Sequence, residues 1–432
     1  MARSRESRVV SLRMFFQIDR KGLTVGRFVV VLIMVQWLAG AAMGEPVVSR
    51  LYSLPVFPRE DSVQQDAETG TELLFLTNAR HKDSNLYFHQ RSWLADGAMI
   101  FLFSDRDKGG VMGYVVETGE LAQITAADGM KLRHPTAAVN RNSLFALAGD
   151  RVVEIQLAIS VKEKKGIKRA KVEARERSLC AIKGIDVYLN ESCDGRYLAA
   201  GGASIEGASK PGLVLIDIAS GAWERLCDMP AGVEYHGHVQ WSITNPNWLS
   251  FAGAPNRLWV VDLRDRKPWC PYVQQKDELV THESWWVNDE LVFCGGIHPK
   301  PSEDSHVKAL DMHNGTVRII GAGSWWPEGT PPEIAKRNWW HAAGSPDGRW
   351  MAADNWHGDI MLFDRKTSRP HLLTTNHRTY GGGEHPEVGW DRKGKQVVFA
   401  SHTLGGVTVC VATVPETWQK ELDTARVGLE AK

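Results

Sequence analysis

The chain has 432 residues and balances 51 lysines and arginines against 51 aspartates and glutamates. This even balance gives no electrostatic signal of a nucleic-acid partner, so we expect none. The length exceeds that of a typical single domain and suits one unit built from repeats. The six cysteines are scattered and lack CxxC spacing, so we expect isolated thiols rather than a disulfide framework.

The first 44 residues have the pattern of a signal peptide. Seven basic residues precede the apolar stretch FVVVLIMVQWLAGAAM, and small residues follow it near Gly44. The stretch is shorter than the roughly 20 residues that a membrane-spanning helix needs, so an uncleaved anchor is the alternative. We therefore expect an exported protein, periplasmic or secreted, with no other membrane contact. The basic region is long, and Met14 is an alternative to Met1 as the start.

After this segment, one short pattern recurs seven times. Each copy has a two-residue turn token and then an apolar run, as in Asp96-Gly97 before MIFLFS and Asp347-Gly348 before WMAADN. The tokens are roughly 40 to 60 residues apart, which is close to the repeat length of four-stranded propeller blades. Further strand-like pieces, bounded by Gly, Pro, Asn and Asp, complete each unit.

The repeats predict an all-β fold, a seven-bladed β-propeller, with two unrelated β domains as the alternative. We expect a lead-in segment over residues 45–70, the propeller over 71–418 and a C-terminal tail over 419–432. The basic run over residues 161–177 alternates with acidic and apolar residues. It is expected to be an exposed hairpin of the second blade.

Six of the seven copies carry a histidine roughly six to nine residues before the token: His89, His134, His238, His282, His341 and His385. The remaining copy has Tyr188 there. If the copies fold alike, these side chains converge at one mouth of the central channel. A single histidine on a strand is usually structural, whereas several beside a carboxylate favour metal binding. Glu387, two residues after His385, would share a strand face with it. Such mixed ligation suits manganese, iron or zinc better than calcium.

Tryptophan doublets stand directly beside His282 and His341. Most tryptophans are expected to pack between blades, but Trp340 at the channel mouth would suit a flat-faced substrate such as a sugar. Arg337 would favour an anionic ligand. No HExxH, EF-hand, GxSxG, Walker or GxGxxG motif occurs in a fitting context. Serine-triad hydrolysis, nucleotide binding and helix-borne zinc proteolysis therefore have no support.

The segments GHVQW, THESW, WWHAAGSPDGRWMAADN and GGEHPEVGW resemble, in order and spacing, the oligogalacturonate lyases of polysaccharide lyase family 22, within the TolB-like β-propeller group. The segment LYFHQRSWLADGAMIFLFSDRD resembles the first blade of that family. The resemblance spans roughly residues 70 to 415. It implies a seven-bladed propeller with a central manganese ion that binds the substrate carboxylate, and a histidine base that starts β-elimination.

Carried over by position, the resemblance makes His282 and His385 metal ligands and His238 the catalytic base. Glu387 stands where the family has a second histidine ligand. His341 matches a position near the substrate or the metal, and we place it with Trp340 and Arg337 as a substrate-binding residue.

Three departures from the family pattern accompany this assignment. Gly382 replaces a glutamine ligand, Gly212 replaces a catalytic arginine, and FAGAPNRLW replaces a His-Glu-Gly segment. The resemblance therefore implies a diverged lyase that acts on oligogalacturonides or a related uronate oligosaccharide, as a monomer or dimer. A non-catalytic exported propeller that binds a glycan or a protein partner is the alternative.

Overall fold

The computed structural model describes residues 46–107, 109–296, 306–323, 338–378, 385–418 and 420. The predicted signal peptide and Arg337 lie outside these residues, and so does Gly382. The chain divides into residues 1–42 and 43–432, and every element below belongs to the second unit. Within the described ranges, no helix combines the length and the apolar character needed to cross a membrane.

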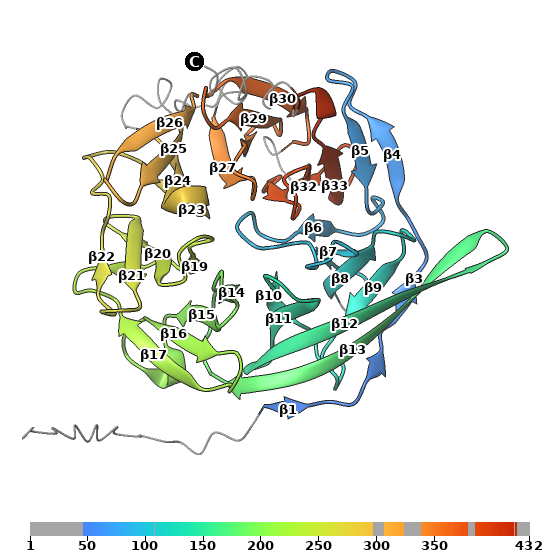
Figure 1. The fold of residues 1–432 in the computed structure, drawn as a ribbon, viewed down its shortest axis with the longest axis horizontal. Coiled ribbons are helices and arrows are strands. Elements are labelled where there is room, and N and C mark those ends of the chain that lie inside the picture. Colours follow the sequence, from blue (N-terminus) through green and yellow to red (C-terminus); the bar gives the residue numbers. More distant parts are fainter. Residues whose placement is uncertain are drawn as a thin grey trace, which may run out of the picture. The chain divides into compact units, whose positions relative to one another are not determined.

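Seven antiparallel sheets are arranged in a ring in this unit, which confirms the seven-bladed β-propeller (Figure 1). Residues of all seven blades line a central channel. The strands of each blade are given in chain order. Blade 1 contains β6 (Asp83–Asn85), β7 (Met99–Ser104), β8 (Gly110–Val115) and β9 (Leu121–Ile124). Blade 2 contains β10 (Arg133–Ala137), β11 (Ser143–Ala148), β12 (Arg151–Lys164) and β13 (Ile167–Ala181). Blade 3 contains β14 (Asn190–Glu191), β15 (Tyr197–Gly202), β16 (Gly212–Asp217) and β17 (Trp223–Asp228).

The next three blades follow the same order. Blade 4 contains β18 (Glu234–Tyr235), β19 (Gln240–Trp241), β20 (Trp248–Ala254), β21 (Leu258–Asp262) and β22 (Pro268–Trp269). Blade 5 contains β23 (Thr281–Trp286), β24 (Glu290–Gly295), β25 (His306–Asp311) and β26 (Val317–Gly321). Blade 6 contains β27 (Trp339–Gly344), β28 (Trp350–Asn355), β29 (Ile360–Asp364) and β30 (Pro370–Thr374). Two short 3-10 turns, Ile205–Gly207 and Val287–Asp289, lie between strands.

Blade 7 joins two distant parts of the chain. It contains β31 (Gly389–Trp390), β32 (Gln396–Ser401), β33 (Thr408–Thr413), β5 (Glu72–Phe75) and β4 (Ser62–Gln65). The pairing of Cys410 with Phe75 closes the ring by hydrogen bonding between β33 and β5. Strands from both ends of the described chain are therefore held in one sheet at the seam.

The apolar runs after the turn tokens form the second strand of each blade. β11, β24 and β28 are buried along their whole length, because neighbouring blades cover both faces of these strands. The tokens themselves place glycine in the left-handed region, with φ of 78° at Gly97 and 70° at Gly348. A side chain would strain that conformation, which explains why glycine recurs there.

The segment before β5 does more than lead into the ring. β1 (Val47–Val48) and β2 (Tyr52–Ser53) pair with β13, β3 (Val56–Phe57) pairs with β9, and β4 pairs with β5. This strap of short strands therefore covers outer edges of blades 2, 1 and 7 (Figure 1). The repeat pattern gave no sign of it.

The basic run over residues 161–177 lies in the long hairpin of β12 and β13, which projects beyond the other strands of blade 2 (Figure 1). Its tip is exposed, as expected for this part of the second blade. All six cysteines lie in the described residues, and none forms a disulfide.

Candidate functional site

The recurrent histidines of blades 4 to 7 gather around the channel. The ring centroids of His282 and His341 are 4.2 Å apart, and those of His341 and His385 are 5.3 Å apart. His238 lies 6.3 Å from His282. These side chains come from the start of the innermost strand of each blade, or from the residues just before it. Because all blades point the same end of this strand toward the same mouth, the sequence spacing brings the imidazoles together.

The two histidines of the first blades differ in position. His89 joins the cluster, with its ring 5.6 Å from that of His238. His134 contacts Tyr188 instead, at 5.3 Å between ring centroids.

His89 reaches the cluster on a loop. The ladder between β6 and β7 pairs Asn85 with Leu102, and the next bridge joins Trp93 to Ile100. Residues 86–92 therefore leave the strand, and they carry Tyr87 and Phe88 to the histidines. Tyr87 lies 5.4 Å from His238, and Phe88 lies 5.3 Å from His341, between ring centroids.

Irregular pairing lets two consecutive residues act at the site in blades 5 and 6. The register between β23 and β24 shifts between Thr281 and Ser284, around His282 and Glu283. The register between β27 and β28 shifts in the same way around Trp340 and His341. A bulge of this kind re-aims a side chain that regular alternation would turn away. It accounts for a carboxylate next to a histidine in one blade and an imidazole next to a tryptophan in the other.

His238 lies against a buried charge pair. Its Nδ1 is 3.3 Å from Oε1 of Glu283, and its Nε2 is 3.3 Å from the hydroxyl of Tyr87. Arg257 donates from Nε to Oε2 of Glu283 at 2.8 Å. Burial lowers the pKa of His238 to about 4 against the opposing effect of Glu283, so the imidazole is neutral at neutral pH. Burial alone would raise the pKa of Glu283, but the charges of Arg257 and His238 and the hydrogen bond from Arg257 together outweigh burial, and the pKa is lowered.

His341 is fixed by a carboxylate on the neighbouring strand. Its Nδ1 lies 2.9 Å from Oδ2 of Asp354, and its backbone N–H donates to Oδ1 at 2.7 Å. Both side chains are buried, and although burial acts in the opposite direction, Asp354 raises the pKa of His341. With Nδ1 facing the carboxylate, Nε2 is left as the ring nitrogen for a ligand. A carboxylate behind an imidazole in this way is the usual second partner of a metal-bound histidine.

The expectation that His385 and Glu387 share a strand face is wrong. Residues 385–388 precede β31 and carry no strand, and Glu387 has a φ of 53°, which breaks the extended alternation. The backbone of Glu387 is nevertheless anchored: its N–H donates to Oδ2 of Asp354 at 2.9 Å, and its carbonyl accepts from Asn85 at 2.6 Å. The same carboxylate therefore positions both His341 and the chain at Glu387.

Trp340 is one of several aromatic residues that pack beside the histidines at the channel mouth. Its ring centroid lies 4.8 Å from His282 and 6.3 Å from His385, nearly parallel to the latter at 24°. Trp356, which the sequence did not single out, lies 4.9 Å from His385 and 5.0 Å from Trp340. The tryptophan predicted to contact substrate thus stands at the histidine cluster. Arg337 lies outside the described residues.

The imidazole and carboxylate side chains at this site are of the kinds that bind a divalent cation. Among the residues that the structure describes, no group of three or more His, Cys, Asp or Glu side chains is arranged to hold a metal ion. Three imidazoles nevertheless meet at the site, and Asp354 backs one of them. Imidazole with carboxylate is a ligand chemistry suited to manganese, iron or zinc.

Sequence reasoning missed several residues that contact these histidines, namely Tyr87, Phe88, Glu283, Asp354 and Trp356, and it missed Arg257, which pairs with Glu283. Glu283 stands inside the THESW motif and Asp354 inside WMAADN, so each was visible as a carboxylate near a recurrent histidine. Arg257 lies in FAGAPNRLW, the segment that departs from the family pattern. Nothing in the sequence indicates that this arginine reaches Glu283 in the next blade.

Among the solved structures that share this fold are two oligogalacturonate lyases. An oligogalacturonate lyase in complex with manganese has a TM-score of 0.65 and 16% sequence identity, over 84% of this chain and 98% of that one. The oligogalacturonate lyase from Vibrio parahaemolyticus has a TM-score of 0.64 and 15% identity, over 85% of this chain and 100% of that one. No protein-family model matches the sequence, and no curated protein does. At such identities, the likeness shows the fold.

Proposed function

We propose that this protein is a metal-dependent lyase that cleaves oligogalacturonides, or a related uronate oligosaccharide, by β-elimination to an unsaturated uronate. One observation carries the proposal: neutral His238 stands beside Glu283 and Arg257 at the channel mouth where His282, His341 and His385 meet. The similarity in fold to two oligogalacturonate lyases supports this class of reaction.

His238 is the proposed base. Elimination begins with removal of the proton alpha to a uronate carboxylate, and this C–H group is a very weak acid. Burial keeps His238 unprotonated at neutral pH, and Nε2, which faces Tyr87, is the nitrogen that takes the proton. Glu283 then stabilises the imidazolium from the Nδ1 side, as a buried carboxylate does for a catalytic histidine elsewhere. The electron pair of the broken C–H bond forms the C4–C5 double bond, the glycosidic C4–O bond breaks and its oxygen takes up a proton, so no water attack is required.

Arg257 is the proposed positioning residue. The family arginine expected at Gly212 is absent, but Arg257 brings a guanidinium to the same carboxylate that supports His238. It holds Glu283 in place through a charge-assisted hydrogen bond.

The metal ligands are proposed to be His282, His385 and Glu387, with manganese as the expected ion. We add His341 to the set, because Asp354 leaves its Nε2 as the ligating nitrogen. When bound, a divalent cation on the uronate carboxylate stabilises the enolate-like charge as a Lewis acid. Trp340 and Arg337 are proposed to contact the sugar, and the protein is proposed to be exported.

The alternative function is a non-catalytic exported propeller that binds a glycan or a protein partner. Gly382 and Gly212, which stand at two positions where the family has functional side chains, favour it. The two functions differ in one measurable product.

The test is incubation of the purified protein with oligogalacturonides and related uronates, with manganese or with a chelator, while ultraviolet absorbance reports the unsaturated product. A lyase gives absorbance that rises with manganese and stops with chelator. If no uronate gives product and the purified protein contains no metal, the lyase function is wrong and the binding function remains.

A further inference from the structure

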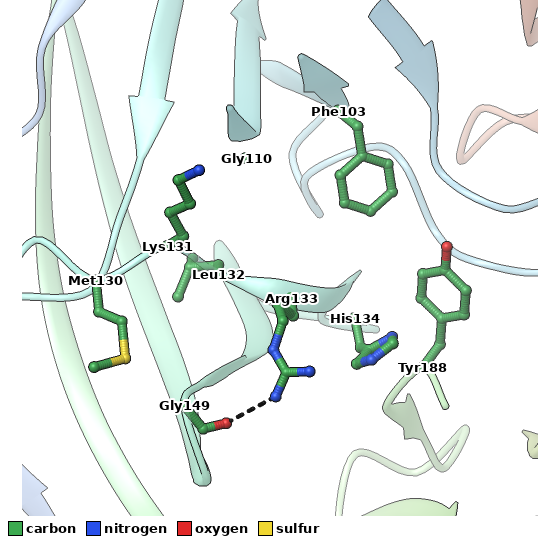
Figure 2. A pocket seen from close by; sticks show the side chains of 9 residues that line it. All are labelled: Phe103, Gly110, Met130, Lys131, Leu132, Arg133, His134, Gly149 and Tyr188. Atoms are coloured by element: carbon green, nitrogen blue, oxygen red, sulfur yellow. Dashed lines mark hydrogen bonds between the residues drawn. The ribbon is translucent and has the colours of Figure 1, made fainter. Parts of the chain in front are cut away.

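A cavity lies beside the histidine cluster, between blades 1 and 2, and is called the larger cavity. It has a volume of about 660 Å³, and its lining includes Lys131, Arg133, His134, Phe103 and Tyr188. Figure 2 shows the rings of Phe103 and Tyr188 on one side and Lys131 on the other, with Arg133 and His134 between them. None of its lining residues is required by the elimination chemistry above.

This cavity is adjacent to the space around the proposed base. A smaller cavity of about 190 Å³ is lined by Tyr87 and His238, and it shares His134 and Tyr188 with the larger one. The ring of Tyr188 stacks on Tyr87 at 5.9 Å with an interplanar angle of 2°. Tyr87 and Tyr188 therefore lie between His238 and the larger cavity, whose lining includes Lys131 and Arg133.

The charge of the larger cavity is positive. Its lining contains the exposed side chains of Lys131 and Arg133 and, among the described residues, no carboxylate. Arg133 donates to the carbonyl of Gly149 at 3.2 Å, so its guanidinium is held at the cavity wall. Asp186 lines the smaller cavity and not the larger one. An anionic group is therefore favoured in the larger cavity.

We propose that the larger cavity binds a further uronate residue of the same oligosaccharide, with its carboxylate at Lys131 and Arg133 and its sugar face on Phe103 or Tyr188. The proposal rests on the lyase function, because the reacting residue is placed at His238. Binding of this further residue would make the protein selective for anionic chains that are long enough to reach from His238 to the larger cavity. Charge-assisted hydrogen bonds and aromatic faces are the contacts that such a residue uses.

The test measures binding of saturated oligogalacturonides from dimer to tetramer by calorimetry. The full chain with His238→Ala is used, so that turnover does not consume the ligand. Adding Lys131→Ala and Arg133→Ala is expected to weaken binding of the tetramer by roughly 10-fold, with a loss that grows from dimer to tetramer. Lys366→Ala with Arg369→Ala removes one lysine and one arginine from the exposed turn between β29 and β30, and serves as the matched control.

Equal losses for all chain lengths, or no loss, would overturn the proposal. Equal binding of a neutral oligosaccharide of the same length would overturn the anionic class. Because both cations are exposed, the variants are expected to fold, and circular dichroism checks this. The ultraviolet assay separates the two proposals: unsaturated product without the length-dependent loss removes the subsite alone, and the loss without any product removes the lyase reaction alone.

Discussion

Arg257 and Glu283 form an ion pair behind His238, with Nε of the arginine 2.8 Å from Oε2 of the carboxylate. Glu283 is fully buried, whereas 16% of the Arg257 side chain is exposed. The arginine directly precedes β21 in blade 4, and the glutamate lies in β23 of blade 5. The pair therefore joins two neighbouring blades and also positions the carboxylate next to the proposed base.

Replacing Arg257 by alanine is expected to lower the free energy of unfolding by about 3–5 kcal/mol, because it leaves a buried carboxylate without its cation. Urea denaturation measures this loss. In the double variant with Glu283→Gln, the combined loss should be smaller than the sum of the single losses, since the two side chains interact directly. Additive losses would show that the pair contributes no coupling.

Replacing His238 by alanine is expected to reduce turnover by roughly 10²–10⁴-fold while the metal content stays that of the wild type. Product absorbance and elemental analysis of the same sample measure the two quantities. His313→Ala removes an exposed histidine of blade 5 and is the control. Loss of metal together with turnover would make His238 a ligand rather than the base.

Replacing Asp354 by asparagine is expected to weaken manganese binding by roughly 10–100-fold, because the carboxylate no longer orients His341. Calorimetric titration of the full chain with manganese measures the affinity without any need for activity. Asp359→Asn is a matched control, since Asp359 is buried in the same blade and lies 2.9 Å from Nδ1 of His357. Equal effects of the two substitutions would contradict the special role of Asp354.

His377 predicts a pH dependence of stability. It is fully buried between the hydroxyls of Thr374 and Ser401, and burial lowers its pKa from 6.5 to about 4. Between these two values the unfolded chain takes up a proton that the folded chain does not, so stability falls as the pH drops through 6.5 toward 4. The loss amounts to roughly 3 kcal/mol.

Urea denaturation between pH 7.5 and pH 4 tests this dependence. His377→Gln is expected to be less stable at pH 7.5 but to show a smaller further loss on acidification. Asp66, which accepts from Thr374, has its pKa lowered to about 2 by hydrogen bonds that outweigh burial, so its contribution is lost mainly below this range. An identical pH profile for the variant and the wild type would rule out His377 as the source.

The seven blades could be predicted from the sequence, because the turn tokens and the apolar runs are local signals that repeat. The strap of β1 to β4 could not, since it is too short and irregular to share the repeat. Its partners are set by the register of outer strands, such as Val47 with Ser178, and no local pattern encodes them.

The candidate site was predictable to the extent that it depends on the repeat. The four histidines at similar positions in the repeat were predicted to lie at one mouth of the channel, and the structure brings them together there: His238, His282, His341 and His385. Tyr87 and Phe88 arrive on a loop that leaves its strand, and Glu283 acts beside His282 through an irregular register. Period-two alternation assigns consecutive residues to opposite faces, so it excluded such neighbours in advance.

The seam of blade 7 couples the folding of the N-terminal strand β5 to that of the C-terminal strand β33. The pairing of β5 with β33 and the hydrogen bond from Thr374 to Asp66 both span more than 300 residues of chain. Contacts of such sequence separation are slow to form. Blades 2 to 6 pair strands that are neighbours in the sequence, whereas ring closure requires Phe75 and Cys410 to come together. The histidine cluster draws on the blades at both sides of this seam, and Asn85 near one side contacts the backbone at Glu387 on the other. A competent site should therefore appear only when the ring closes, so ring closure and the gain of metal affinity are expected to share one rate.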